Sequence, residues 1–310
     1  MAAVALSSLE GRLPNVRGRL TKDAPLSGLT WFRTGGVADL LFRPSDEADL
    51  KSFLKGLSEA ISLTVIGLGS NLLVRDGGIR GVVIKLGKPF GDIDTKGDQI
   101  TAGAGASCVA LAHRARVAGL AGLEFFRGIP GTVGGAVVMN AGAYGSETAD
   151  VLISVRCLDR SGRDIRIPAT EIDFGYRSTS LSPDLLIVGV VIRGTPAEPQ
   201  TIAENMSQIV EAREESQPLR TRTGGSTFKN PDVGQAAGRK AWQLIEEAGC
   251  RGLTIGGAQV SEKHCNFLIN TGAATSKDLE SLGEEVRRRV KQATGVDLEW
   301  EIRRIGERKR

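Results

Sequence analysis

A glycine-rich segment with almost no charge lies near the middle of the chain. It reads RGIPGTVGGAVVMNAGAY from Arg127 to Tyr144, and Arg127 is its one charged residue. Without Cβ atoms, such a segment can turn through positive φ and bring successive backbone N–H groups close to a ligand, and phosphate suits such amides. The alternative is a buried turn between two strands, which is the more common role of a single segment of this kind.

Two further glycine loops favour the phosphate interpretation. GLGSN spans Gly67 to Asn71 after the apolar run Leu63 to Ile66, and RTGG spans Arg33 to Gly36. In GLGSNL a leucine replaces the third glycine of the dinucleotide motif G-x-G-x-x-G, and no G-x-x-x-x-G-K-[ST] occurs in the chain. A Rossmann domain or a P-loop NTPase is therefore disfavoured, and we expect loops alone to hold the phosphates.

Residues suited to catalysis occur in the second half. Arg177 stands in FGYRS, Ser226 in GGSTFKNP, and Glu299 and Glu301 alternate around Trp300. On a strand, this spacing places both glutamates on one face. An arginine, a serine and a glutamate could together bind a carboxylate, donate a proton and stabilise charge that develops during a reaction.

Hydrolase and zinc chemistry have little support. Neither Ser70 nor Ser226 fits G-x-S-x-G, and the chain offers two histidines, of which His113 lies in a helical pattern and is expected to be structural. The four cysteines are far apart and include no C-x-x-C pair, which predicts free buried thiols and no metal site. They are Cys108, Cys157, Cys250 and Cys265.

The composition is that of an ordinary soluble protein. The 310 residues are 41% apolar and carry a net charge of +4, and the 40 glycines are about twice the usual share. With 5% aromatic residues, a nucleic-acid interface is disfavoured, and the basic residues from Arg303 to Arg310 are interpreted as solvated. No basic residue precedes the apolar start Ala2 to Leu6, and glycines interrupt the uncharged segment, so neither a signal peptide nor a membrane span is expected.

The spacing of apolar residues and the positions of glycine, proline and capping residues predict the elements that position these residues. Predicted helices are 45–57 with Ser45 as N-cap, 108–118, 202–215, 239–248, and a last helix to about 293 with Ser276 as N-cap. Predicted strands are 63–66, 82–86, 185–192 and 296–305, with a hairpin formed by 153–158 and 164–167. Pro196 and Pro199 mark a domain boundary.

Seven motifs occur in the order found in the UDP-N-acetylenolpyruvoylglucosamine reductase family, which the chain resembles from about Leu29 to Gly306. They are WFRTGG, GLGSNLLV, GIPGTVGGAVVMNAGAYG, FGYRS, GGSTFKNP, KHCNFLIN and LEWEIRRIG. Trp300 stands where many members have proline. No insertion with an extra substrate-clamping tyrosine follows Tyr144, so the chain resembles the subtype without that loop.

The resemblance implies an α+β fold, with a two-lobed, vanillyl-alcohol-oxidase-like FAD-binding domain and a C-terminal α/β substrate-binding domain. The implied division is 1–28 as an N-terminal segment, 29–87 and 88–197 as the FAD lobes, and 198–310 as the substrate domain. FAD would be bound without a covalent bond. The implied FAD-binding residues are Arg33, Thr34, Gly35, Gly67, Gly69, Ser70, Asn71, Leu72, Gly128, Pro130, Gly131, Thr132, Gly134, Gly135, Asn140, Ala141 and Gly142.

The resemblance also implies a cytoplasmic enzyme, expected to be a monomer, that uses NADPH to reduce the flavin and then a UDP-sugar enolpyruvate at C3. Arg177 and Glu301 would stabilise the resulting charge, and Ser226 would protonate C2. Contacts with the substrate would come from Tyr176, Lys229, Asn230, Lys263 and Asn266. An oxidase of the same fold acting on a hydroxy acid or sugar is the nearest alternative, and a non-catalytic nucleotide- or nucleic-acid-binding protein is the alternative from another class.

Overall fold

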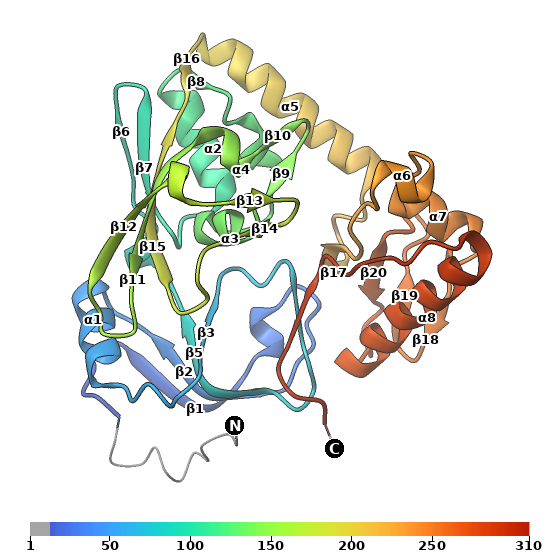
Figure 1. Ribbon diagram of the computed structural model, residues 1–310, viewed down its shortest axis with the longest axis horizontal. Coiled ribbons are helices and arrows are strands. Elements are labelled where there is room, and N and C mark those ends of the chain that lie inside the picture. The colour runs from blue at the N-terminus through green and yellow to red at the C-terminus, as the bar shows by residue number, and fades with distance from the viewer. Residues whose placement is uncertain (1–12, 310) are drawn as a thin grey trace. The chain divides into compact units, whose positions relative to one another are not determined.

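The computed structural model describes residues 13–309, which pack as two compact units (Figure 1). Among the described residues, unit 1 comprises 13–23, Asp39–Leu68 and Gly81–Ala212, and unit 2 comprises Ala24–Ala38, Gly69–Arg80 and 213–309. The apolar start Ala2 to Leu6 lies outside the described residues. The chain thus passes repeatedly between units, and the four-part division expected from sequence stays a prediction.

Two sheets, of which the first lies mostly and the second entirely in unit 1, form the framework of that unit (Figure 1). The first has the order β1 (Arg19–Pro25), β2 (Val37–Arg43), β5 (Ile79–Lys85), β3 (Leu63–Ile66), with β3 and β5 parallel. The second has the order β12 (Asp164–Pro168), β11 (Leu152–Leu158), β15 (Leu186–Arg193), β7 (Gln99–Gly103), β6 (Ile93–Lys96), and neighbouring strands are antiparallel. The predicted hairpin is confirmed, because β11 and β12 pair with Val155 opposite Ile167.

Helices and short strand pairs complete unit 1. The helices are α1 (Glu47–Gly56), α2 (Cys108–Val117), α3 (Val133–Val138), α4 (Thr148–Val151) and most of α5 (Pro199–Ser216), with 3-10 turns η3 (Lys88–Phe90), η4 (Glu124–Gly128) and η5 (Ala169–Glu171). The short pairs are β9 (Gly142–Ala143) with β10 (Ser146–Glu147), β13 (Phe174–Gly175) with β14 (Ser178–Thr179), and β8 (Leu120–Ala121) with β16 (Thr195–Pro196). One core joins sheet and helices, since Val155 and Val190 of the second sheet lie in the same buried cluster as Leu111 of α2 and Val133 of α3.

A separate core holds unit 2 together. Its elements are η2 (Ser27–Leu29), the parallel pair β4 (Leu72–Val74) and β21 (Arg303–Ile305), the sheet β17 (Arg222–Ser226), β20 (Phe267–Asn270), β19 (Ala258–Val260), β18 (Thr254–Ile255), and the helices α6 (Val233–Ala236), α7 (Ala241–Glu247) and α8 (Ser276–Thr294). Its buried cluster includes Phe32, Phe228 and the predicted apolar stripe of α8, which is Leu279, Leu282, Val286 and Val290. That stripe is confirmed.

Both N-cap predictions were wrong by one residue. Asp46 caps α1, because its carboxylate accepts the N–H of Asp49. Thr275 caps α8 in a reciprocal arrangement with Asp278, while the Ser276 hydroxyl is buried and donates to the Val74 carbonyl at 2.6 Å. In each case a neighbouring polar side chain had the backbone conformation and reach that a cap requires.

One prediction about the C-terminus was also wrong, and a second holds only in part. The stretch 296–305 is not one strand, because regular pairing is confined to β21 and Trp300 forms an isolated bridge with Phe228. Arg303, Arg308 and Lys309 are exposed, in agreement with their interpretation as solvated, but Arg304 is half-buried. Arg304 forms ion pairs with Glu280 at 3.3 Å and with Glu284 at 2.7 Å.

The expectation of free buried thiols is confirmed for all four cysteines. Burial raises the pKa of Cys108 and of Cys265 to about 12 and that of Cys157 to about 11, so these thiols stay protonated at neutral pH. Among the residues that the structure describes, no helix has the length and apolar character needed to cross a membrane.

Replacing Glu47 with glutamine is expected to lower the free energy of unfolding at about pH 6 more than at about pH 3. A hydrogen bond from Arg156, with another from Lys51, lowers the pKa of Glu47 from 4.5 to about 2 in the folded protein. Between these values the unfolded chain binds more protons, so the stabilisation is complete above about pH 4.5 and is lost as the pH falls toward 2.

Urea unfolding at the two pH values measures this difference. Glu171→Gln, at an exposed glutamate of η5, is the matched control for the substitution itself. An equal loss for Glu47→Gln at both pH values would contradict the assignment.

Candidate functional site

In unit 1, the central glycine segment is closely packed where it meets the first part of the GLGSN loop. A Cβ atom on Gly67 would lie 2.5 Å from the Thr132 hydroxyl oxygen, and one on Gly128 would lie 3.1 Å from the Tyr144 ring. Gly67 therefore needs glycine for space, whereas a Cβ atom on Gly128 would require the Tyr144 ring to move by a few tenths of an ångström. A residue not predicted from sequence, Lys85, donates from Nζ to the Gly67 carbonyl, and burial lowers the pKa of its ammonium. Lys85 thus anchors this loop from the end of β5.

Most amides around the start of α3 are used within the protein. The N–H of Val133 donates to Ala106 O at 2.9 Å, and that of Gly134 to Ala104 O at 3.0 Å. The Gly135 N–H donates to the Thr132 hydroxyl at 3.3 Å. This differs from the row of ligand-facing amides expected from sequence, because the segment folds back and pairs with the residues that follow β7. Glycine here mainly allows backbone segments to approach closely, instead of leaving N–H groups free for a ligand.

Asn140 connects this segment to the hairpin that carries Arg177. Its side chain is fully buried, donates to the Gly175 carbonyl at 3.3 Å and accepts the Ala149 N–H at 3.0 Å. Arg177 occupies the turn between β13 and β14 with φ of 58°, and its guanidinium lies 5.1 Å from the centre of the exposed Tyr176 ring. Unit 1 therefore brings Arg177, Tyr176 and the glycine segment together.

In unit 2, the RTGG loop and the second part of the GLGSN loop lie side by side. The Trp31 N–H donates to the Gly69 carbonyl at 3.0 Å, and the Gly36 N–H donates to Arg75 O at 3.1 Å. Gly69 has φ of 68°, and a Cβ atom there would lie 2.1 Å from the Leu29 carbonyl oxygen. A Cβ atom on Gly35 would meet Val74 at 2.9 Å. Glycine is required at both positions.

These loops have features of a cofactor cradle. The hydroxyl oxygen of Thr34 is buried and has no hydrogen-bond partner among the described residues. A buried polar atom left without a partner is costly, so it marks a place where a ligand can complete the hydrogen bonding. Together with backbone that approaches too closely for any Cβ, this orphaned hydroxyl fits the binding of a phosphate-containing cofactor.

Unit 2 also brings Ser226 and Glu301 onto adjoining backbone segments. Ser226 ends β17, and the next residue, Thr227, accepts the Glu301 N–H at 2.8 Å. Asn71 of the GLGSN loop donates from Nδ2 to the Glu301 carbonyl at 3.2 Å. Both Ser226 and Glu301 are half-buried. The segments that carry Ser226 and Glu301 are thus joined by a backbone hydrogen bond, and the Asn71 side chain joins the GLGSN loop to the second of them.

The geometry distinguishes the two candidate glutamates. Glu299 is exposed and forms an ion pair with Lys229 at 3.3 Å. Glu301 is half-buried beside the end of β17. The two do not lie on one face of a strand, because the segment that holds them is irregular. Burial and position favour Glu301 as the group that acts on a ligand.

The remaining predicted substrate contacts are distributed over unit 2. Asn230 accepts the Ala241 N–H at 3.1 Å, and Lys263 donates to the Glu214 carbonyl. Asn266 is buried and pairs with both backbone groups of Phe228, at 3.0 Å and 2.8 Å. We therefore propose that Asn266 supports the segment after Ser226 instead of contacting a ligand.

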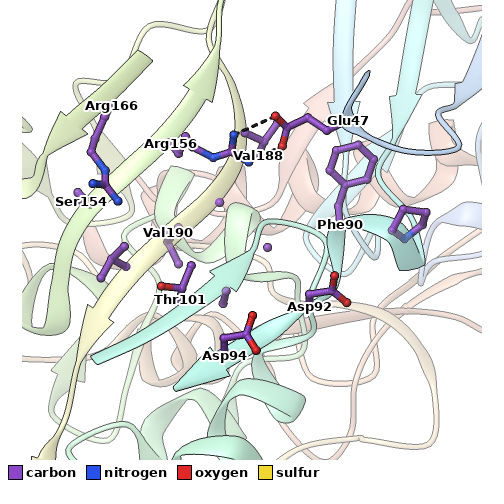
Figure 2. A pocket seen from close by; sticks show the side chains of 15 residues that line it. Glu47, Phe90, Asp92, Asp94, Thr101, Ser154, Arg156, Arg166, Val188 and Val190 are labelled. Atoms are coloured by element: carbon purple, nitrogen blue, oxygen red, sulfur yellow. Dashed lines mark hydrogen bonds and ion pairs between the residues drawn. The ribbon is translucent and has the colours of Figure 1, made fainter. Parts of the chain in front are cut away.

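A cavity of about 250 Å³ lies elsewhere in unit 1, against strands of the five-stranded sheet (Figure 2). Asp92 and Asp94 stand on one side of it and Arg156 and Arg166 on the other. Arg156 is already paired with Glu47 at 2.9 Å. None of the predicted cofactor, catalytic or substrate residues is among those that line the cavity, so it is not the predicted site.

Comparisons with known proteins bear on both units. Residues 38–167 match an FAD binding domain, and residues 217–305 match the UDP-N-acetylenolpyruvoylglucosamine reductase C-terminal domain. A UDP-N-acetylenolpyruvoylglucosamine reductase of Parvibaculum lavamentivorans is 56% identical over 309 residues, which is 100% of this chain and 98% of the relative. The enzyme of Novosphingobium aromaticivorans is 57% identical over 94% of this chain and 97% of its own length.

A solved structure gives the same result. The crystal structure of the UDP-N-acetylenolpyruvylglucosamine reductase from Thermus caldophilus matches with a TM-score of 0.79 and 35% identity, covering 94% of this chain and 99% of that one. The predicted fold class, with an FAD-binding domain followed by a C-terminal domain, is therefore confirmed. Full-length identity above one half, together with the two matched domains, shows that this chain belongs to the UDP-N-acetylenolpyruvoylglucosamine reductase family of FAD-dependent oxidoreductases.

Proposed function

We propose that the chain catalyses the NADPH-dependent reduction of UDP-N-acetylglucosamine enolpyruvate to UDP-N-acetylmuramate, a step of peptidoglycan precursor synthesis. Family membership supports the reaction. The observation that carries the assignment of residues is the backbone link between Thr227 and Glu301, which places a hydroxyl donor, Ser226, on the segment next to a half-buried carboxylate. We further propose that the enzyme is a cytoplasmic monomer.

FAD is bound without a covalent bond in this proposal. Many flavin oxidases attach the cofactor to histidine or cysteine, and neither residue type occurs in the three glycine loops. The Thr34 hydroxyl and the close-packed backbone at Gly35, Gly67 and Gly69 are the features that fit the cofactor. The other predicted FAD-binding residues keep that role as part of the proposal.

The chemistry divides between the cofactor and the side chains. When bound, the flavin supplies the hydride that adds to C3 of the enolpyruvyl group. The charge that develops on C2 and the substrate carboxylate is stabilised by the Arg177 guanidinium, with Glu301 assisting. The Ser226 hydroxyl then donates its proton to C2 and regains one from solvent. A hydroxyl is a weak acid, so this step requires a strongly basic C2 and a site that excludes water.

Lys229, Asn230, Lys263 and Tyr176 are proposed as contacts for the diphosphate, sugar or carboxylate of the substrate. Each carries a polar group at a solvent-accessible position. The Lys229 ammonium is held by Glu299 at 3.3 Å, so an anionic substrate group would compete with that carboxylate for it.

Anaerobic spectroscopy tests the reaction. The purified protein should show flavin absorbance that NADPH bleaches, and the colour should return when the enolpyruvyl substrate is added. NADPH alone must not give recovery, because the electrons then have no acceptor. Recovery with oxygen at the same rate as with the enolpyruvyl substrate, or no effect of the substrate at all, would instead favour an oxidase.

Ser226→Ala is expected to lower turnover by about 10²–10⁴-fold, since a positioned proton donor contributes on that scale. Reduction of the flavin by NADPH should be unchanged, because it does not use this proton. Stopped-flow measurement of each half-reaction separates the two. Ser207→Ala, at an exposed serine of α5, is the matched control, and turnover that survives in Ser226→Ala would show that the donor is another group.

Gly69→Ala is expected to weaken FAD binding by at least about tenfold, because its Cβ would displace the Leu29 carbonyl in the loop pair. Gly97→Ala is the matched control. Gly97 has a similar φ of 60°, but its Cβ would meet nothing within 4 Å. Titration of the apoprotein with FAD, followed by flavin fluorescence, measures both. Equal affinities in the two variants would mean that the loop does not hold the cofactor.

A further inference from the structure

The indole of Trp300 is held on several sides within unit 2. Its Nε1–H donates to Glu284 Oε1 at 2.8 Å, and the Arg304 guanidinium lies 4.4 Å from the centre of the ring. The Phe228 ring is 5.2 Å away, centre to centre. Glu284 is itself held by Arg287 at 2.7 Å and by Arg304 at 2.7 Å. The indole is therefore fixed by a directional hydrogen bond in addition to packing.

Gly283 of α8 provides the space for this ring. A Cβ atom on Gly283 would lie 2.2 Å from Cη2 and 2.3 Å from Cζ2 of Trp300, far closer than real atoms approach. Gly283 lies inside a helix, where glycine is less favourable than alanine by about 0.5–1 kcal/mol. Its φ lies outside the left-handed region, so the close contact is the structural reason for glycine here.

The backbone segment that carries this ring also carries Glu301. Trp300 immediately precedes Glu301 and forms a bridge with Phe228, two residues after Ser226. Backbone hydrogen bonds lie on either side of that bridge. The Lys229 N–H donates to the Glu299 carbonyl at 2.9 Å, and the Glu301 N–H donates to the Thr227 carbonyl at 2.8 Å. A shift of the indole would therefore move Glu301 relative to Ser226.

We propose that Trp300, seated on Gly283 and held by Glu284 and Arg304, is a positioning residue that sets the placement of the Glu301 carboxylate relative to the Ser226 hydroxyl. This inference rests on the proposed roles of Ser226 and Glu301. Trp300 does not itself contact the substrate in this proposal. A displacement of about 1 Å in a catalytic group can cost about 10²-fold in rate, so small changes under the ring should be measurable.

Gly283→Ala tests the proposal without altering Trp300 or Glu301. The chain has three tryptophans, so protein labelled with 5-fluorotryptophan should give three ¹⁹F signals, and Trp300→Phe identifies the one from Trp300. We expect Gly283→Ala to shift that signal. We also expect it to slow reoxidation of the reduced flavin by the enolpyruvyl substrate by about 10–100-fold and to leave reduction by NADPH unchanged.

A double-mutant cycle gives the matched control. Phenylalanine does not extend as far as Cη2, so in the Trp300→Phe background the alanine at 283 should cause little further loss of rate. Glu284→Gln keeps an acceptor for the indole N–H and should retain more of the reoxidation rate than Glu284→Leu, which removes it.

Four outcomes would overturn the proposal. They are a ¹⁹F signal that does not move in Gly283→Ala, a signal that moves while the reoxidation rate is unchanged, an equal slowing of both half-reactions, and an equal effect of Gly283→Ala in both backgrounds. A wild-type protein that the enolpyruvyl substrate cannot reoxidise would instead refute the proposed function itself, and the ¹⁹F experiment would still test how Trp300 is seated.

Discussion

The placement of Glu301 beside Ser226 depends on one backbone hydrogen bond, from the Glu301 N–H to the Thr227 carbonyl. This bond joins Thr227, the residue after β17, to Glu301, which lies 74 residues later in an irregular segment. The Phe228–Trp300 bridge extends this contact on one side, and Asn71 extends it on the other by binding the Glu301 carbonyl. Backbone bonds of this kind fix a side chain more firmly than a surface ion pair does, since few torsions remain between the anchor and the reacting group.

Local patterns predicted local structure well. The β11–β12 hairpin followed from alternation around turn residues, and the stripe of α8 followed from helical spacing. The caps were each missed by one position, because Ser45 and Asp46, or Thr275 and Ser276, are both good capping residues and only backbone conformation selects between them. The stretch 296–305 looked like a strand from its composition, but its pairing depends on β4, more than 200 positions earlier, which periodicity does not detect.

The candidate site, too, was predictable from sequence only in part. The glycine loops were visible in sequence because glycine at such density is unusual, and the motif order identified the family. The sequence did not predict which amides face a ligand, because the N–H groups of Val133 and Gly134 donate to carbonyls of the residues that follow β7. The contribution of Lys85 was also hidden, since a lysine at the end of an apolar strand gives no signal that its ammonium reaches a loop carbonyl. Contacts between segments distant in sequence decide these points.

Neither compact unit is made from one continuous stretch of polypeptide, and this has a consequence for biosynthesis. Unit 2 draws Ala24–Ala38 and Gly69–Arg80 from a part of the chain that is synthesised well before its other segment, and β4 can pair with β21 only after more than 200 further residues have been made. Non-local pairing of this kind slows folding and leaves strand edges exposed in the meantime. The nascent chain must therefore leave β4 without its strand partner until β21 has been synthesised, a period during which holding chaperones would have their greatest effect on yield.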